Sequence, residues 1–205
     1  MAEIDVQPKK RSGSFLPWLL GILAVIILCV FLFRKKDTND TADRDRANYN
    51  NTSTNAAAAG GWSAIDWNAP STNYDEVTNH DIEVRSKDNY AVYGLGENVL
   101  FDKDAATLKP GAENNLQQVV TSINKRYNGG DVGVFGFADA TGSEGHNQDL
   151  SQQRAETVRS WLVKHGIDDS HVSIQAKGEN NPVATNSTEE GKQQNRRVEI
   201  VARKQ

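Results

Sequence analysis

The chain has almost no cysteine. Cys29 is the only one in 205 residues, so no intramolecular disulfide can form. Cys29 also does not fit a lipid-attachment site, because Ile27 and Leu28 precede it where bacterial lipoprotein signals carry small residues. We therefore interpret Cys29 as a small apolar residue without a chemical role.

Metal-binding and catalytic patterns are also missing. The four histidines show no HxxxH or HExxH spacing and have no cysteine partners. Asp102, Asp104 and Glu113 partly match a calcium-loop pattern, but its positions five and six are Ala106 and Thr107. No serine or cysteine nucleophile with a suitable base stands out. We expect no metal, no cofactor and no enzymatic activity.

Positive charge is not in excess. Lysine and arginine total 23 against 27 aspartates and glutamates, which gives a net charge of −4. Proteins that bind the phosphate backbone carry a basic stripe or patch, so we do not expect a nucleic acid partner. Hydrophobic residues make up 37% of the chain, a low share, and many of them lie in one segment near the N-terminus.

That segment is residues 15–33, FLPWLLGILAVIILCVFLF, which contains no charge. Its length is close to the roughly 20 residues that cross a bilayer, and basic residues 34–36 follow it where a signal peptide would have a cleavage site. We predict a transmembrane helix that follows a short tail, residues 1–14, and remains as a single-pass anchor.

Charge does not determine the orientation of this anchor. Basic residues 9–11 and 34–36 flank it equally, so the positive-inside rule gives no answer. The short N-terminal tail favours an N-in topology with the C-terminal part in the periplasm. An α-helical span favours the inner membrane, since outer-membrane spans are usually barrels, although association with the outer membrane stays open.

Residues 34–80 are expected to be a flexible linker. The stretch 37–61 is rich in Asn, Thr, Asp and Ala and has no apolar periodicity. Trp62 and Trp67 stand in polar surroundings, where they either cover a sheet edge or rest on the membrane interface. The folded domain is then expected at residues 81–205.

Within residues 81–205, short strand patterns alternate with helical ones. Pro110 suits the first turn of a helix, and apolar residues follow it at helical spacing as far as Tyr127. Alternating strands and helices imply an α/β (α+β) sandwich with a mixed sheet. The expected strands are 82–84, 90–95, 99–101, 132–138, 172–176 and a last one from 196, and the expected helices are 110–127, 147–165 and a turn at 189–194.

An acid and a base are placed to act together. The strand-like run VFGFA ends on Asp139, and the next helix carries Arg154 in line with Leu150 and Val158, on a face that should point at the core. Helical side chains lean toward the N-terminus, which aims Arg154 at the Asp139 loop. The pair is either a simple salt bridge or a clamp for a ligand with an ammonium and a carboxylate side by side.

The segment FGFADATGSEGHNQDLSQQRAETV, followed by GENNPVATNSTEEGKQQNRRVEI, closely resembles the OmpA-like peptidoglycan-binding domain. The resemblance covers roughly residues 93–202 and implies a two-layer sandwich with a βαβαβ core. It also implies that Asp139 and Arg154 clamp the diaminopimelate of a peptidoglycan stem peptide, with Asn147, Asp102 and Arg196 near the same cleft. Where many relatives have HTD or YTD, this chain reads FAD.

The resemblance implies non-covalent peptidoglycan binding that tethers a membrane to the bacterial cell wall. Two alternatives remain open. One is an ion-driven stator or transport component like the flagellar protein MotB, which needs a carboxylate within the membrane, and residues 15–33 contain none. The other is a protein-interaction module with partner proteins in the cell envelope.

Overall fold

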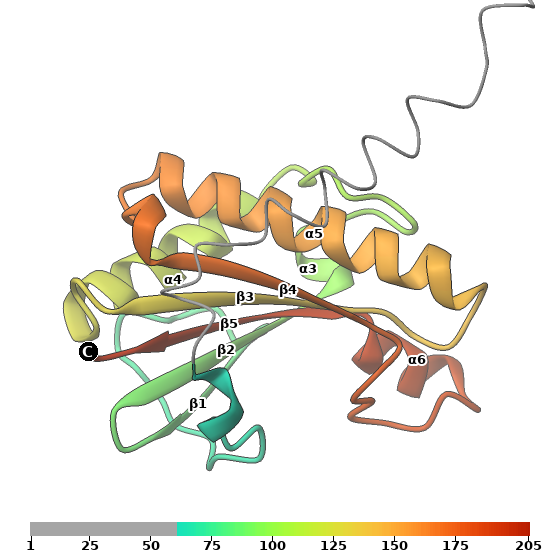
Figure 1. Ribbon diagram of the computed structural model, residues 1–205, viewed down its shortest axis with the longest axis horizontal. Helices are drawn as coiled ribbons and strands as arrows, with labels where there is room; N and C mark the ends of the chain where they lie inside the picture. Colours follow the sequence, from blue (N-terminus) through green and yellow to red (C-terminus); the bar gives the residue numbers. More distant parts are fainter. Residues whose placement is uncertain (1–60) are drawn as a thin grey trace, which may run out of the picture. The chain divides into compact units, whose positions relative to one another are not determined.

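The computed structural model describes residues 61–205, and Figure 1 shows a twisted sheet with helices α4 and α5 over one face. The strand order is β1-β2-β5-β3-β4. The strands are β1 (Ile82–Lys87), β2 (Tyr90–Gly96), β3 (Asp131–Phe137), β4 (Val172–Gly178) and β5 (Arg197–Arg203). The helices are α3 (Glu97–Leu100), α4 (Ala112–Arg126), α5 (Glu144–Lys164) and α6 (Glu189–Asn195), with 3₁₀ turns η1 (Trp62–Ala64) and η2 (Asp169–His171).

The sheet is mixed, as the sequence predicts. Strands β3 and β4 are parallel and are joined by α5, while every other neighbouring pair is antiparallel. The last strand, β5, lies between β2 and β3 and pairs with both. The expected α+β class with helices packed on a mixed sheet is therefore confirmed.

Helix α4 follows from its sequence. Gly111 adopts a positive φ of 90° just before the helix, a conformation that glycine tolerates best. Leu116, Val119 and Ile123 then recur at helical spacing and are buried against the sheet. The helix ends at Arg126, one residue short of the predicted end.

Helix α5 packs unusually close to the sheet. A side-chain carbon at Gly136 of β3 would lie 2.0 Å from the carbonyl oxygen of Ser151, so only glycine permits this contact. The helix begins at Glu144, three residues before its predicted start, because Ser143 caps it by accepting a hydrogen bond from the His146 backbone N–H at 3.3 Å. This close packing brings the polar side chains of the first half of α5 to the end of β3.

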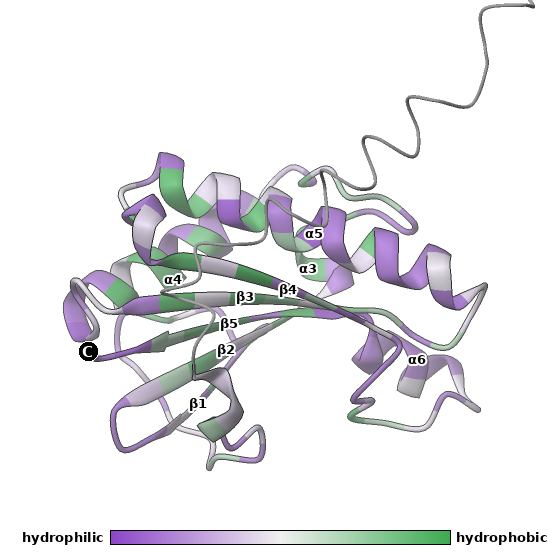
Figure 2. Cartoon of the chain, viewed as in Figure 1, coloured by the Kyte–Doolittle hydropathy of each residue, from purple (hydrophilic) through white to green (hydrophobic). Residues whose placement is uncertain are grey.

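Both faces of the sheet are covered. The helix face carries the main core, to which α4 and α5 contribute apolar side chains, and Figure 2 shows green, apolar stretches on both helices. On the opposite face, called here the second face, Trp62 and Ile65 pack with Phe135 and Val201 in a smaller cluster. Trp62 meets Phe135 edge-on at 5.9 Å and donates to the Ser173 hydroxyl at 3.1 Å.

Two sequence-based expectations differ from the structure. Residues 99–101 were expected in a strand, but Val99 and Leu100 belong to the helical turn α3, where both side chains still reach the core. The folded domain was expected to start at Asp81, whereas packing contacts already begin at Trp62. Residues 62–80, called here the strap, cover the sheet without a helical or strand period. The sequence pattern therefore did not indicate that they belong to the domain.

The predicted tail, transmembrane helix and most of the predicted linker lie outside the described residues. None of the helices between residues 61 and 205 is long and apolar enough to cross a membrane.

Candidate functional site

The site is built around the loop that leaves the end of β3. Asp139 lies two residues after the last residue of β3, and its Oδ1 accepts a hydrogen bond from the backbone N–H of Thr141 at 2.7 Å. This local turn holds the carboxylate against the sheet, and Asp139 is only 6% exposed. The second carboxylate oxygen is therefore left for a partner from elsewhere in the chain.

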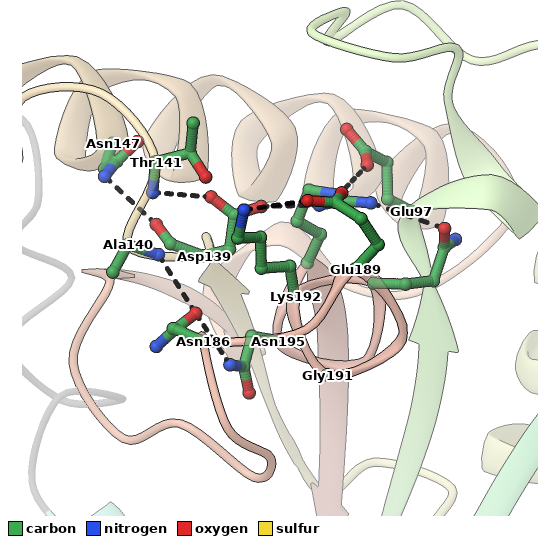
Figure 3. A network of polar contacts seen from close by, with 12 residues as sticks. Glu97, Asp139, Ala140, Thr141, Asn147, Asn186, Glu189, Gly191, Lys192 and Asn195 are labelled. Carbon is green, nitrogen blue, oxygen red and sulfur yellow. Dashed lines mark hydrogen bonds and ion pairs between the residues drawn. The ribbon is translucent and has the colours of Figure 1, made fainter.

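Four charged side chains form an alternating chain of ion pairs. Arg196, which follows α6, binds the Asp139 carboxylate and also donates to Glu97 Oε2 at 2.5 Å. The other oxygen of Glu97 accepts from Arg154 of α5. The order is thus Asp139–Arg196–Glu97–Arg154, and Figure 3 labels the two acids of this series, Asp139 and Glu97.

Arg154 is one of the most deeply buried side chains of the domain, with 1% exposed. Its Nε donates to the carbonyl oxygen of Ala105 at 2.9 Å, and its guanidinium carbon lies 5.3 Å from the centre of the Phe101 ring. Burying a charge is costly unless it is paired and hydrogen-bonded. The Glu97 carboxylate and the Ala105 carbonyl meet that requirement here.

The ion pairs shift two pKa values. Burial raises the pKa of the Asp139 carboxyl, but hydrogen bonds from Arg196 and Thr141 outweigh burial, so the net pKa lies below its usual value. Burial lowers the pKa of Arg196, yet the bonds to Asp139 and Glu97 raise it above its usual value. Asp139 and Arg196 are therefore both charged at neutral pH.

Asparagines hold the loops around these ion pairs. Asn147 of α5 donates to the Asp139 carbonyl oxygen at 3.0 Å and to Glu179 Oε2 at 2.8 Å. Asn186 accepts from the Ala140 backbone N–H at 3.1 Å and from the Asn195 side chain at 2.9 Å. The loop after β3 and the segment before β5 are thus tied together, as the dashed lines in Figure 3 show.

The structure brings most of the predicted site residues together. Arg154 lies on the buried face of α5, Asn147 supports the Asp139 loop, and Arg196 reaches Asp139 directly. Asp102 differs, since its side chain is exposed and its backbone carbonyl accepts from the Ala105 N–H at 3.1 Å. Its loop nevertheless supplies the carbonyl that caps the Arg154 guanidinium.

In place of a direct salt bridge between Asp139 and Arg154, the structure shows two ion pairs that the Arg196–Glu97 contact links. Asp139 binds Arg196, and Arg154 binds Glu97, which sequence analysis did not single out. The sequence did hold a signal for Glu97, which lies between two apolar runs in YGLGENVLF. An acid in such a position is expected to be buried, and a buried carboxylate needs a cationic partner. Within residues 61–205, no three acidic, histidine or cysteine side chains cluster in a way that could hold a metal ion.

The domain thus combines a mixed sheet, helices on one face and buried, alternating charges at the end of β3. Residues 100–196 match the model of the OmpA family, so this part of the chain is an OmpA family domain.

Among curated proteins, the chain is similar to the probable lipoprotein YiaD of Escherichia coli (strain K12). The two are 47% identical over 116 residues, which cover 57% of this chain and 52% of YiaD. The peptidoglycan-binding protein ArfA of Mycobacterium tuberculosis is 41% identical over 106 residues, 52% of this chain and 32% of ArfA. The chain thus spans about half the length of YiaD and about a third of ArfA.

Among solved structures, the chain is similar to the cell wall anchor of the T6SS from Pseudomonas aeruginosa. The TM-score is 0.58 at 26% identity, over 64% of this chain and 93% of that one. The periplasmic domain of Helicobacter pylori MotB gives a TM-score of 0.58 at 22% identity, over 66% of this chain and 88% of that one. At that identity the MotB likeness shows a shared fold.

Proposed function

We propose that this domain binds peptidoglycan non-covalently and that Asp139 and Arg154 grip the diaminopimelate of the stem peptide. The observation that carries the proposal is the buried, alternating series Asp139–Arg196–Glu97–Arg154 in an OmpA family domain. A zwitterionic amino acid centre offers an ammonium and a carboxylate side by side, which is the complement of an acid and a base held at one site.

In this proposal, ligand binding replaces ion pairs within the protein by ion pairs with the ligand. Asp139 and Arg154 are 6% and 1% exposed, so a ligand reaches them by displacing existing contacts. The ligand carboxylate takes the place of Glu97 on the Arg154 guanidinium, whose fork suits a carboxylate, and the ligand ammonium meets Asp139. No charge is left unpaired in the bound state, because Arg196 retains Glu97 as its partner.

The relatives agree with such a role. ArfA is named a peptidoglycan-binding protein, and the Pseudomonas aeruginosa structure is described as a cell wall anchor. By analogy we place this chain in the bacterial cell envelope as a binding protein instead of an enzyme. The fold shared with MotB is compatible with the stator alternative but adds no residue in its favour.

The second part of the proposal concerns the membrane. Residues 15–33 would anchor the chain in the inner membrane with the N-terminus inside, and the domain would hold the cell wall from the periplasm. Weak binding at each stem peptide is compatible with firm attachment, because many anchors on one polymer raise the effective concentration.

A sedimentation experiment with isolated cell walls tests the clamp. The 205-residue chain in detergent should sediment with the walls. Asp139→Asn, which removes the negative charge, and Arg154→Lys, which removes the two-pronged guanidinium contact, should each weaken sedimentation with little change in side-chain size.

The matched control is Asp131→Asn. Asp131 begins the strand that Asp139 follows, and it binds Arg203 at 2.8 Å at the opposite end of β3. This variant should sediment like the unmodified chain. Unchanged sedimentation of folded Asp139→Asn and Arg154→Lys would show that the clamp residues are wrongly assigned.

A further inference from the structure

The second face of the sheet carries a groove that the proposed clamp does not use. Two adjoining hollows of about 530 Å³ and 380 Å³ share Trp67, Arg197 and Glu199 in their walls. The larger one has Gly94 of β2 in its lining, where the absence of a side chain leaves room above the strand. Volumes of this size are typical of small-ligand sites.

The charges in the groove compensate one another. Glu199 Oε1 accepts from Arg85 at 2.8 Å and from Arg197 at 3.0 Å. Arg85 also donates to the Trp67 carbonyl oxygen, and Arg197 donates to the Asn181 carbonyl oxygen at 3.3 Å. Each guanidinium group therefore already has a carboxylate partner within the protein, which favours an uncharged polar ligand over an anion.

One buried acceptor in this groove has no partner. Glu199 has a side chain that is 2% exposed, and among the described residues its Oε2 receives no hydrogen bond. A buried polar atom without a partner is costly, and such atoms are rare in folded proteins. A hydroxyl or amide N–H of a ligand would satisfy it.

The groove also offers a rigid apolar platform. The partly exposed Trp67 is held edge-on against Phe135 at 4.9 Å and against Phe137 at 6.4 Å. Val183, which is 56% exposed, lines both hollows beside it. An aromatic ring next to hydrogen-bonding groups suits a sugar, which presents C–H bonds on its ring face and hydroxyls around its edge.

We propose that this groove binds the glycan strand of the cell wall, an uncharged chain of N-acetylated amino sugars. The inference rests on the proposed function, since it gives the same polymer a second contact. Arg196 belongs to the clamp and Arg197 to the groove, so the two sites meet at consecutive residues. Trp67, Arg85 and Glu199 lie outside residues 100–196, so the groove is built largely from parts that the family match does not include.

Calorimetric titration with chitohexaose tests the proposal, because this sugar carries no peptide for the clamp. The 205-residue chain is kept in a detergent without a sugar headgroup. We expect saturable binding that Trp67→Ala weakens by about tenfold, as for a central aromatic contact.

Gly94→Val provides a second variant with less risk to folding. A side-chain carbon at Gly94 meets its nearest neighbours at 3.6 Å, an ordinary contact, so the strand has room for a first side-chain carbon here and the valine methyl groups extend into the groove. It should weaken chitohexaose binding while the melting temperature stays close to that of the unmodified chain. The control is Gly145→Ala on α5, where the added carbon meets nothing within 4 Å.

Titration with a diaminopimelate-containing tripeptide separates the two proposals. Peptide binding with no chitohexaose binding up to about 10 mM would overturn the glycan site and leave the clamp standing. Undiminished chitohexaose binding by Gly94→Val would also overturn it. Chitohexaose binding that Gly94→Val abolishes, without any peptide binding, would support the glycan site and contradict the clamp.

Discussion

Glu97 is the residue on which the buried ion pairs converge. It is 5% exposed and binds both Arg154 and Arg196. Glu97→Gln leaves the Arg154 charge buried without a counter-ion, so we expect the free energy of unfolding to fall by about 3–5 kcal/mol in urea titrations. The control Glu189→Gln removes an exposed carboxylate that binds Lys192 and should change little. Equal effects of the two substitutions would contradict the assigned role of Glu97.

The lowered pKa of Asp139 predicts that the free energy of unfolding depends on this carboxylate in acid. Its pKa is lower in the folded state, where bonds from Arg196 and Thr141 outweigh the effect of burial. Such a group stabilises the fold above its unfolded pKa of about 3.9, and this contribution is lost as the pH falls through the lower folded value. Unfolding free energies measured from pH 7 to pH 2 should therefore decline less steeply below about pH 4 in Asp139→Asn. Identical slopes would refute this linkage.

The candidate site could be predicted in part from single residues. Arg154 stood out because a charge interrupted an apolar helical stripe, and Asp139 because it ended a buried strand. Their partners could not be deduced, since Arg154 and Glu97 are 57 residues apart and meet only through tertiary packing. Local periodicity reports which face a residue occupies, not which oppositely charged residue it meets.

At the scale of elements, the strap that begins with η1 is expected to contribute to stability. Trp62 is 4% exposed, packs on Phe135 and lies 4.6 Å from the Arg203 guanidinium carbon. Trp62→Ala should lower the free energy of unfolding by about 3–5 kcal/mol, as large core truncations do. The neighbouring control Ser63→Ala alters an exposed side chain and should be neutral in the same urea titrations. A neutral Trp62→Ala would mean that the strap is dispensable.

Regular elements were predictable because their patterns repeat. Helix α4 differs from its predicted range by a residue or two at each end, and four of the strands lie close to where alternation or apolar runs placed them. The helical turn α3 was misread as a strand, since four residues are too few to reveal a helical period. The strap was missed for the same physical reason, because its buried residues Trp62, Ile65 and Ala69 follow no regular period.

For the molecule as a whole, the packing of Trp62 shortens the available tether. If residues 15–33 anchor the chain as proposed, residues 34–61 connect the membrane to the domain, with a reach of roughly 90 Å at about 3.3 Å per residue. Deleting residues 41–60 reduces that reach to roughly 25–30 Å. We expect this deletion to abolish cross-linking to the cell wall in intact cells while purified protein still sediments with isolated walls.

Scrambling residues 41–60 at constant length is the matched control, and it should preserve cross-linking because reach depends on length more than on order. Loss of cross-linking in the scrambled chain would point to a specific sequence requirement instead of a spacer.

The position of β5 determines when the domain can form. The last strand in sequence is a central one in space, and it alone joins the β1–β2 hairpin to the β3–β4 pair. Contacts so distant in sequence form late, and chains are synthesised at about 5–20 residues per second. The five-stranded sheet therefore cannot close until Arg197–Arg203 has left the ribosome, and the two halves of the sheet stay unjoined until then.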